Sequence, residues 1–171
     1  MPLDIHLEDD QFPYAGFKQT RIVARAILMD ASGNFAIHRL HGFDRFGDRN
    51  YYETPGGGVD EGETPEQAVV RECYEETGYR VEMVEFLAKV TDFYNCLSRK
   101  NINYYYLCKV KSDFNGTHFV SHGDTLIAET LFLPIDEVIK RYESTPDVML
   151  SKLVKNRELP VWRYAKDLLN K

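Results

Sequence analysis

The chain contains few cysteines, and their spacing excludes two common uses of this residue. Its 171 residues include Cys73, Cys96 and Cys108, and no two of them form a C-x-x-C motif. A single disulfide would leave one thiol over, so neither a disulfide framework nor a cysteine-rich zinc site is indicated. Free thiols are typical of a reducing compartment, and we therefore expect a cytoplasmic protein.

Long apolar runs are also missing. A membrane-spanning helix needs about 18 or more apolar residues in succession, and the candidate stretch "IVARAILM" is interrupted by Arg25. The first residues, "MPLDIHLEDDQ", are acidic and lack the basic start and apolar centre of a signal peptide. We therefore expect no secretory leader and no membrane partner.

The chain has no excess of basic residues. The chain has 21 Lys and Arg residues against 27 Asp and Glu residues, a net charge of −6. Residues 60–76 hold seven acids and one base, so the acidity is local. Proteins that bind nucleic acids through their phosphates usually present a basic face, and no nucleic-acid partner is expected. The spacings of a P-loop and of an EF-hand loop are missing as well.

The apolar residues suffice for a substantial core. They make up 43% of the chain, and 13% of the residues are aromatic. Length and composition favour one domain over residues 1–171, with a helical extension at about 146–171. Strand-like and helix-like segments alternate, which predicts an α/β or α+β layered domain with a mixed sheet. Predicted strands are 19–30 and 34–41 (a hairpin through "DASGN"), 81–94, 101–111 and 125–133; predicted loops are 42–50 and 112–124; predicted helices are 65–77, 134–142 and one or two around Pro160.

The helix at 65–77 has clear start and stop signals. Thr64 is the expected N-cap, Pro65 the first helical residue and Gln67 the partner of a capping box. Gly78 is the expected left-handed residue just past the C-terminus.

Three carboxylates lie on one side of this helix. At 100° per residue, Glu72, Glu75 and Glu76 fall away from an apolar stripe that includes Val69 and Cys73. A solvated acidic face is one explanation, but such a face normally carries lysines, and this one has none. Mg²⁺ prefers carboxylate oxygens together with substrate phosphates, which favours a metal site.

Residues 57–79 read "GGVDEGETPEQAVVRECYEETGY" and resemble the Nudix box, G-x5-E-x7-R-E-U-x-E-E-x-G-U, where U is a bulky apolar residue. All seven fixed positions match, and the chance of this at one start site is on the order of 10⁻⁸ to 10⁻⁹. The resemblance implies a Nudix-type α/β/α sandwich around a mixed sheet. The matching residues are Gly57, Glu63, Arg71, Glu72, Glu75, Glu76 and Gly78.

The resemblance also implies roles within the box. Glu72, Glu75 and Glu76 would ligate Mg²⁺ or Mn²⁺, with a backbone carbonyl of Gly56 or Gly57 as a further ligand. Glu63 and Arg71 would form a structural ion pair, and Gly78 would close the helix. The general base is not fixed in position among Nudix proteins. One candidate is a glutamate of the box, such as Glu75. The other is an acid from a later loop or strand, and Glu129 is the candidate there.

The implied activity is metal-dependent hydrolysis of a nucleoside diphosphate linked to another moiety. Expected substrates are a nucleoside triphosphate, a nucleotide sugar or a dinucleoside polyphosphate. The alternatives are a Nudix-fold domain that senses a nucleotide without turnover and an isomerase of the same fold that acts on an isoprenoid diphosphate.

Residues outside the box are expected to hold the substrate. Arg39, Arg45 and Arg49 are candidates for phosphate contacts, and Tyr104 is a candidate platform for a nucleobase, although surface solvation and core packing explain them equally well. Tyr94 is weak support for a dinucleoside polyphosphate, since some Nudix members that cleave such substrates have a tyrosine in that region. His118 and His122 have no assigned role, and the apolar C-terminal residues either cap the core or form a homodimer contact.

Overall fold

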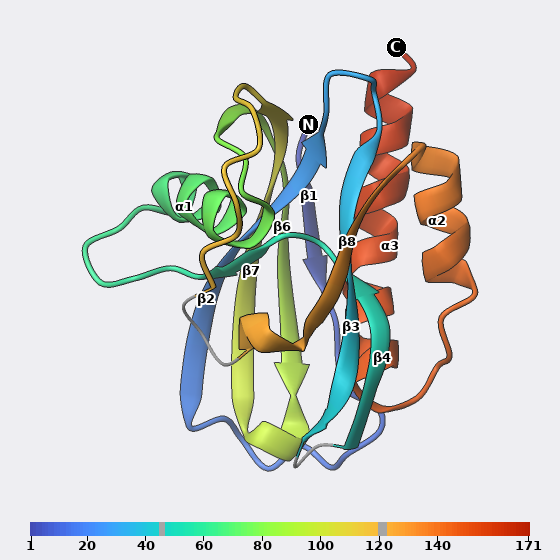
Figure 1. Ribbon diagram of the computed structural model, residues 1–171. Helices are drawn as coiled ribbons and strands as arrows, with labels where there is room; N and C mark the ends of the chain where they lie inside the picture. The colour runs from blue at the N-terminus through green and yellow to red at the C-terminus, as the bar shows by residue number, and fades with distance from the viewer. Residues whose placement is uncertain (45–46, 120–122) are drawn as a thin grey trace.

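The computed structural model describes residues 1–44, 47–119 and 123–171. Its centre is an eight-stranded mixed sheet in the order β1-β6-β7-β2-β3-β4, with β5 paired to β2 and β8 paired to β3. Figure 1 shows α1 on one side of the sheet and α2 and α3 on the other. The elements are β1 (Leu3–His6), β2 (Gln19–Met29), β3 (Phe35–Asp44), β4 (Gly47–Glu53), β5 (Gly56–Gly58), α1 (Pro65–Thr77), β6 (Val81–Tyr94), η1 (Asn95–Leu97), β7 (Arg99–Val110), η2 (Gly123–Leu126), β8 (Ile127–Leu133), α2 (Ile135–Glu143) and α3 (Met149–Leu169).

Strand β2 shows how the sheet separates two apolar layers. Neighbouring residues of a strand point to opposite faces. Ala24, Ala26 and Leu28 pack in one cluster with residues of α1. Ile27 packs in a second cluster with Trp162 of α3. The sheet is therefore covered on both faces, which is the α/β/α arrangement that the sequence predicts.

The predicted hairpin of residues 19–30 and 34–41 is present, but its strands pair only beside the turn. Met29 is opposite Phe35, and the Asp30 carboxylate accepts the N–H groups of Ser32 and Asn34. Farther from the turn, β2 pairs with β5 and β3 pairs with β8. The two strands diverge there, and a cavity opens on the face where β5 lies.

The prediction of a loop at residues 42–50 was wrong for its described part. Residues up to Asp44 belong to β3, and β4 starts at Gly47 and runs antiparallel to it. The sequence here is polar and lacks a period-two apolar pattern. Because β4 is at the edge of the sheet, backbone pairing with β3 suffices to hold it.

The C-terminal region is one helix with Pro160 inside it. Leu159, Val161, Trp162 and Ala165 on both sides of the proline are buried in the cluster that α3 shares with the sheet. Packing on one continuous face therefore outweighs the backbone hydrogen bond that proline removes. No helix in the described part of the chain is long and apolar enough to cross a membrane.

Candidate metal and phosphate site

Helix α1 begins and ends as its sequence predicts. The Thr64 hydroxyl accepts the Gln67 N–H at 3.2 Å, and the Gln67 side chain accepts the Thr64 N–H at 2.9 Å. Gly78 has φ +74, and its N–H reaches the Tyr74 carbonyl. A Cβ at Gly78 would lie 2.6 Å from the Gly116 carbonyl oxygen, so glycine is required there for space as well as conformation.

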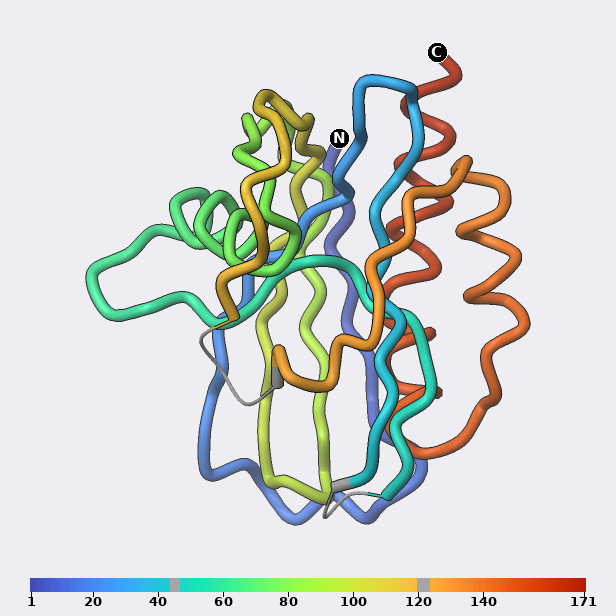
Figure 2. Tube along the Cα trace, viewed as in Figure 1, coloured from blue at the N-terminus to red at the C-terminus, as the bar shows by residue number. Residues whose placement is uncertain are grey.

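Two carboxylates of α1 meet a third acid from a distant segment. Glu72, Glu76 and Asp124 are all buried, and each offers an oxygen within 4.8 Å of the other two. We call these three residues the acidic cluster. Asp124 lies in η2, at the end of the predicted loop 112–124. Figure 2 shows residues 112–119 of that loop running beside α1, where the His118 N–H donates to the Glu75 carbonyl at 2.6 Å.

The glycines of β5 allow the glutamates of α1 to lie directly against the strand. The Gly56 N–H donates to Glu76 Oε1 at 2.7 Å. A Cβ on Gly57 would lie 2.6 Å from the Glu72 carboxylate. Strand β5 therefore presents bare backbone to the helix, and the glutamate side chains fill the space that side chains of β5 would otherwise occupy.

The expectation that the carboxylates face away from the core was wrong for two of the three. Glu72 is 8% exposed and Glu76 is 3% exposed, whereas Val70 of the predicted apolar stripe is 37% exposed. The helical angles separate these glutamates from the apolar stripe, but they do not show what packs against that side of the helix. The buried arc of α1 instead runs through Ala68, Glu72 and Glu76, because β5 has no side chains to keep them out.

Arg71 partly offsets the clustered negative charge. Its guanidinium donates to both oxygens of Glu63 at 2.8 and 2.9 Å, to Glu72 at 2.9 Å and to Glu75 at 3.3 Å. It also donates to the Gly58 carbonyl at 3.0 Å, which ties the glycine segment to the helix. The Arg71 hydrogen bonds lower the pKa of Glu63 below its usual value. The contact between Glu63 and Arg71 is the one that the box resemblance implies.

Burial disfavours the ionised forms of the two glutamates in the acidic cluster. It raises the pKa of Glu76 well above its ordinary value, despite the hydrogen bond from Gly56. Burial also raises the pKa of Glu72, opposed by its hydrogen bond from Arg71. A cation at this position would stabilise the ionised carboxylates and so oppose both shifts.

His38 is a further buried group at the site that sequence reasoning missed. Its Nε2 is 3.5 Å from Glu76 Oε2, and its Nδ1 is 2.9 Å from the Thr130 hydroxyl. Burial lowers the pKa of His38 to about 4, so the ring is neutral near pH 7. In the sequence it is a lone histidine in an apolar strand, which carries no signal. Asp124 had a weak signal, because it ends a loop longer than usual.

A cavity of about 900 Å³ joins the acidic cluster to the face of the sheet. Gly56, Gly57, Glu75 and Arg49 line it together with the acidic cluster. Arg49 donates to the Tyr51 hydroxyl at 2.8 Å. Among the residues that the structure describes, six arginines and no lysine border the cavity, namely Arg21, Arg25, Arg49, Arg71, Arg99 and Arg157.

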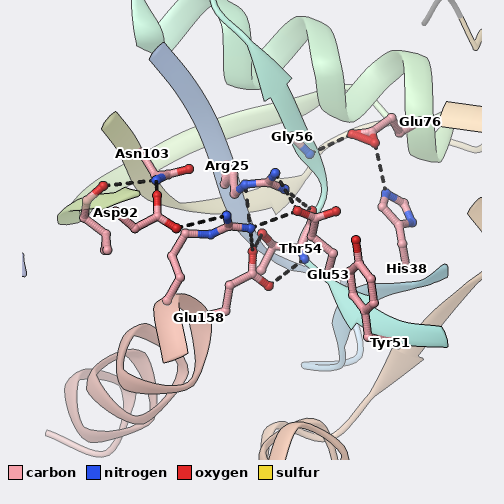
Figure 3. A network of polar contacts seen from close by, with 12 residues as sticks. Arg25, His38, Tyr51, Glu53, Thr54, Gly56, Glu76, Asp92, Asn103 and Glu158 are labelled. Carbon is pink, nitrogen blue, oxygen red and sulfur yellow. Dashed lines mark hydrogen bonds and ion pairs between the residues drawn. The ribbon is translucent and has the colours of Figure 1, made fainter. Parts of the chain in front are cut away.

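The floor of the cavity is a buried polar network (Figure 3). Glu53 pairs with Arg25 at 2.6 Å and with Arg157 at 2.9 Å. Glu158 accepts hydrogen bonds from the Thr54 N–H and hydroxyl at 2.9 and 2.8 Å. It also accepts from the hydroxyls of Tyr105 and Tyr142 at 3.2 and 2.6 Å. We call Glu53, Arg25, Arg157, Glu158 and their partners the floor network.

Other predicted site residues lie away from this cavity. Arg39 and Glu129 form an ion pair with each other at 2.8 Å, with side chains 34% and 48% exposed. They are opposite each other on β3 and β8. Neither borders the cavity.

Tyr104 packs beside Phe86 in the layer shared with α1. Its neighbours Asn103 and Tyr105 point to the opposite face of β7, and Asn103 lines the cavity. His118 stacks on Tyr74 at 5.0 Å, outside the cavity lining. Arg45 and His122 lie outside the described residues.

Comparisons with known proteins agree with this geometry. A family model described as the NUDIX domain matches residues 19–153. The RNA pyrophosphohydrolase of Cereibacter sphaeroides is 52% identical over 42 residues, 25% of this chain and 26% of that protein. The protein of the same name from Shewanella sediminis is 58% identical over 43 residues, 25% and 24% of the two chains. The chain thus spans about a quarter of the length of the curated relatives that it matches.

Solved structures resemble the whole fold. The MutT protein from Methanosarcina mazei Go1 superposes with a TM-score of 0.63 at 20% identity, over 88% of this chain and 96% of that chain. An Ap4A hydrolase from C. elegans gives a TM-score of 0.59 at 18% identity, over 88% and 98%. At these identities the likeness concerns the fold, and it confirms the predicted sandwich.

Proposed function

Because the chain belongs to the Nudix domain family, we propose that it is a hydrolase that cleaves a phosphoric anhydride in a nucleotide-linked substrate with the help of Mg²⁺ or Mn²⁺. One observation carries the proposal: a cluster of acidic side chains and a set of arginines share one cavity. The acidic cluster and six arginines line the same cavity. An anionic substrate is repelled by the acids unless a cation is present.

The side chains fit a hard divalent cation. Glu72, Glu76 and Asp124 supply carboxylate oxygens at close range, and Glu75 and the backbone of Gly56 line the same cavity. Such oxygens are the ligands that Mg²⁺ prefers. When bound, the ion would supply Lewis-acid stabilisation of phosphate oxygens and an acidified water.

The chain's own groups then divide the remaining work. Arg71 holds Glu63, Glu72 and Glu75 together, which fixes the carboxylates relative to the glycine segment. Neutral His38 lies against Glu76 and limits its movement. Arg49, which lines the cavity, would bind phosphate oxygens of the substrate.

For the general base we propose Glu75. It lines the cavity and is not one of the three acids in the close cluster. Its side chain is 16% exposed, more than that of Glu72 at 11%, so a water molecule can reach it. The geometry favours Glu75 over Glu129, since Glu129 is paired with Arg39 outside the cavity.

The candidate substrates share a phosphoric anhydride. Those expected from the sequence are nucleoside triphosphates, nucleotide sugars and dinucleoside polyphosphates. The name of the relatives, RNA pyrophosphohydrolase, adds the 5′ end of an RNA to the candidates, although the net charge of −6 does not favour a long RNA contact. A cytoplasmic location and a homodimer stay predictions.

A substrate panel tests the proposal. The protein is incubated with Mg²⁺ or Mn²⁺ and each candidate, and release of a nucleoside monophosphate or of phosphate products is followed by chromatography. We expect turnover of at least one compound that is lost in Glu76→Gln and kept in Glu129→Gln, an acid outside the cavity. Binding without turnover across the panel would instead support a nucleotide-sensing domain. An equal loss of turnover in Glu76→Gln and Glu129→Gln would indicate that Glu129 takes part in catalysis.

A further inference from the structure

We propose that Arg21 and Arg99 form a second anion-binding subsite in this cavity, which selects substrates with a chain of at least three phosphoryl groups. The inference rests on the proposed function and deepens it. The acidic cluster with its cation would bind the anhydride to be cleaved, and the two arginines would bind a phosphoryl group beyond it. A nucleotide sugar, with two phosphoryl groups and an uncharged sugar, would leave this subsite empty.

Strand register places both arginines on the cavity wall. Strands β2 and β7 run parallel, with Gln19 opposite Arg99 and Arg21 opposite Asn101. Alternate residues of a strand share a face, and Arg21, Val23 and Arg25 of β2 all line the cavity. Arg99 and Asn101 of β7 line it next to them.

These two arginines differ from their neighbours in lacking an ionic partner. Arg25 and Arg157 pair with Glu53, and Arg71 pairs with Glu63. Within the described residues, no carboxylate forms an ion pair with Arg21 or Arg99. The Nε of Arg99 is buried and has no hydrogen-bond acceptor. Its guanidinium lies over the Tyr94 ring, 5.0 Å from the centroid, which holds it against the wall.

Both guanidinium groups are accessible from the cavity. Arg21 is exposed and Arg99 is half-buried. Desolvation at the cavity wall lowers the pKa of Arg21, the charges of Arg25 and Arg99 lower it further, and Glu53 opposes them. A phosphoryl group offers oxygens that match the planar fork of arginine.

The subsite is next to the acidic cluster but separate from it. A Cβ on Gly58 would be 3.8 Å from the Arg21 guanidinium, so Arg21 lies beside the glycine segment. On the other side of that segment, Arg71 donates to the Gly58 carbonyl and contacts Glu72. A linear polyphosphate that passes Gly58 would therefore meet the acids with one phosphoryl group and Arg21 with the next.

The test compares polyphosphate binding and turnover in Arg21→Gln and Arg99→Gln. The control is Arg163→Gln, an exposed arginine of α3 paired with Glu143. Calorimetry measures the affinity for inorganic tripolyphosphate in Mg²⁺ buffer. Steady-state kinetics compare a nucleoside triphosphate, a dinucleoside tetraphosphate and a 5′-triphosphorylated oligoribonucleotide with a nucleotide sugar. Losing one charged hydrogen-bond donor is expected to weaken tripolyphosphate binding roughly ten- to hundredfold and to raise KM similarly for the long chains. The KM for the nucleotide sugar is expected to stay unchanged.

The outcomes separate this inference from the proposed function. Weaker tripolyphosphate binding in the two variants, with no turnover of any compound by the native protein, keeps the subsite and overturns the hydrolase. Turnover of long phosphate chains with unchanged KM in both variants keeps the hydrolase and overturns the subsite. An equal effect of Arg163→Gln, or an equal rise of KM for the nucleotide sugar, also overturns the subsite.

Discussion

Two buried charged regions lie a short distance apart on the cavity wall, and they are composed differently. The floor network places two arginines against two glutamates, which form ion pairs with one another. The acidic cluster gathers three carboxylates, and Arg71 contacts it through Glu72. Buried charges that are paired with opposite charges contribute to the fold. Buried charges of one sign require a bound ligand of the opposite charge.

The largest expected effect comes from unbalancing the floor network. In Glu158→Gln the amide NH₂ would face the donors of Thr54, Tyr105 and Tyr142, and an arginine charge would lose a partner. We expect a loss of about 3–5 kcal/mol in the free energy of unfolding. Urea denaturation measures it. The control Glu143→Gln removes an exposed pair and should change stability by less than about 1 kcal/mol. If Glu158→Gln and Glu143→Gln lost equally little free energy of unfolding, the floor network would not stabilise the fold.

The next effect tests the close approach of β5 to α1. In Gly57→Ala the new Cβ would overlap the Glu72 carboxylate, so this buried group must move out of its hydrogen bond with Arg71, at a cost of about 1–3 kcal/mol. Gly58→Ala is the matched control, because its Cβ would make only an ordinary contact at 3.8 Å. Thermal unfolding of both variants without metal measures the difference. If Gly58→Ala is equally destabilising, the argument from space fails.

A smaller effect on stability is expected from removing charge in the acidic cluster. The side-chain carbonyl of Glu76→Gln can still accept the Gly56 N–H, and one buried repulsion disappears. The fold should therefore be unchanged or slightly more stable in metal-free buffer, while Mg²⁺ or Mn²⁺ affinity falls at least about tenfold. Calorimetry and melting curves with and without metal measure both quantities. A large drop of the melting temperature without metal would mean that the cluster is balanced like the floor network.

The smallest effect concerns the exposed pair of Arg39 and Glu129. Exposed ion pairs contribute about 0–1 kcal/mol, and neither residue lines the cavity. The double variant Arg39→Gln/Glu129→Gln should keep both stability and turnover. A strong loss of turnover with intact stability would place the active surface on β3 and β8.

Local signals explain which parts of the structure could be predicted. The capping box and Gly78 placed α1 at Pro65–Thr77, and the long strand β6 was placed at Val81–Tyr94. Both depend on neighbouring residues in the chain. The pairing of residues 42–44 with β4 and the continuation of α3 through Pro160 depend on contacts with distant segments. The sequence predicted a loop at 42–50 and left open whether one or two helices surround Pro160.

By itself, the sequence determined the family, the position of the acidic helix and the identity of its three glutamates, because the box is a continuous stretch with fixed spacing. Only the tertiary structure decided that Glu72 and Glu76 are buried, that Asp124 and His38 join them, and that Arg39, Tyr104 and Glu129 lie elsewhere. The physical reason is that burial and pairing depend on what packs opposite a side chain. For this helix the opposite surface is a strand of glycines, which admits carboxylates where any larger residue would exclude them.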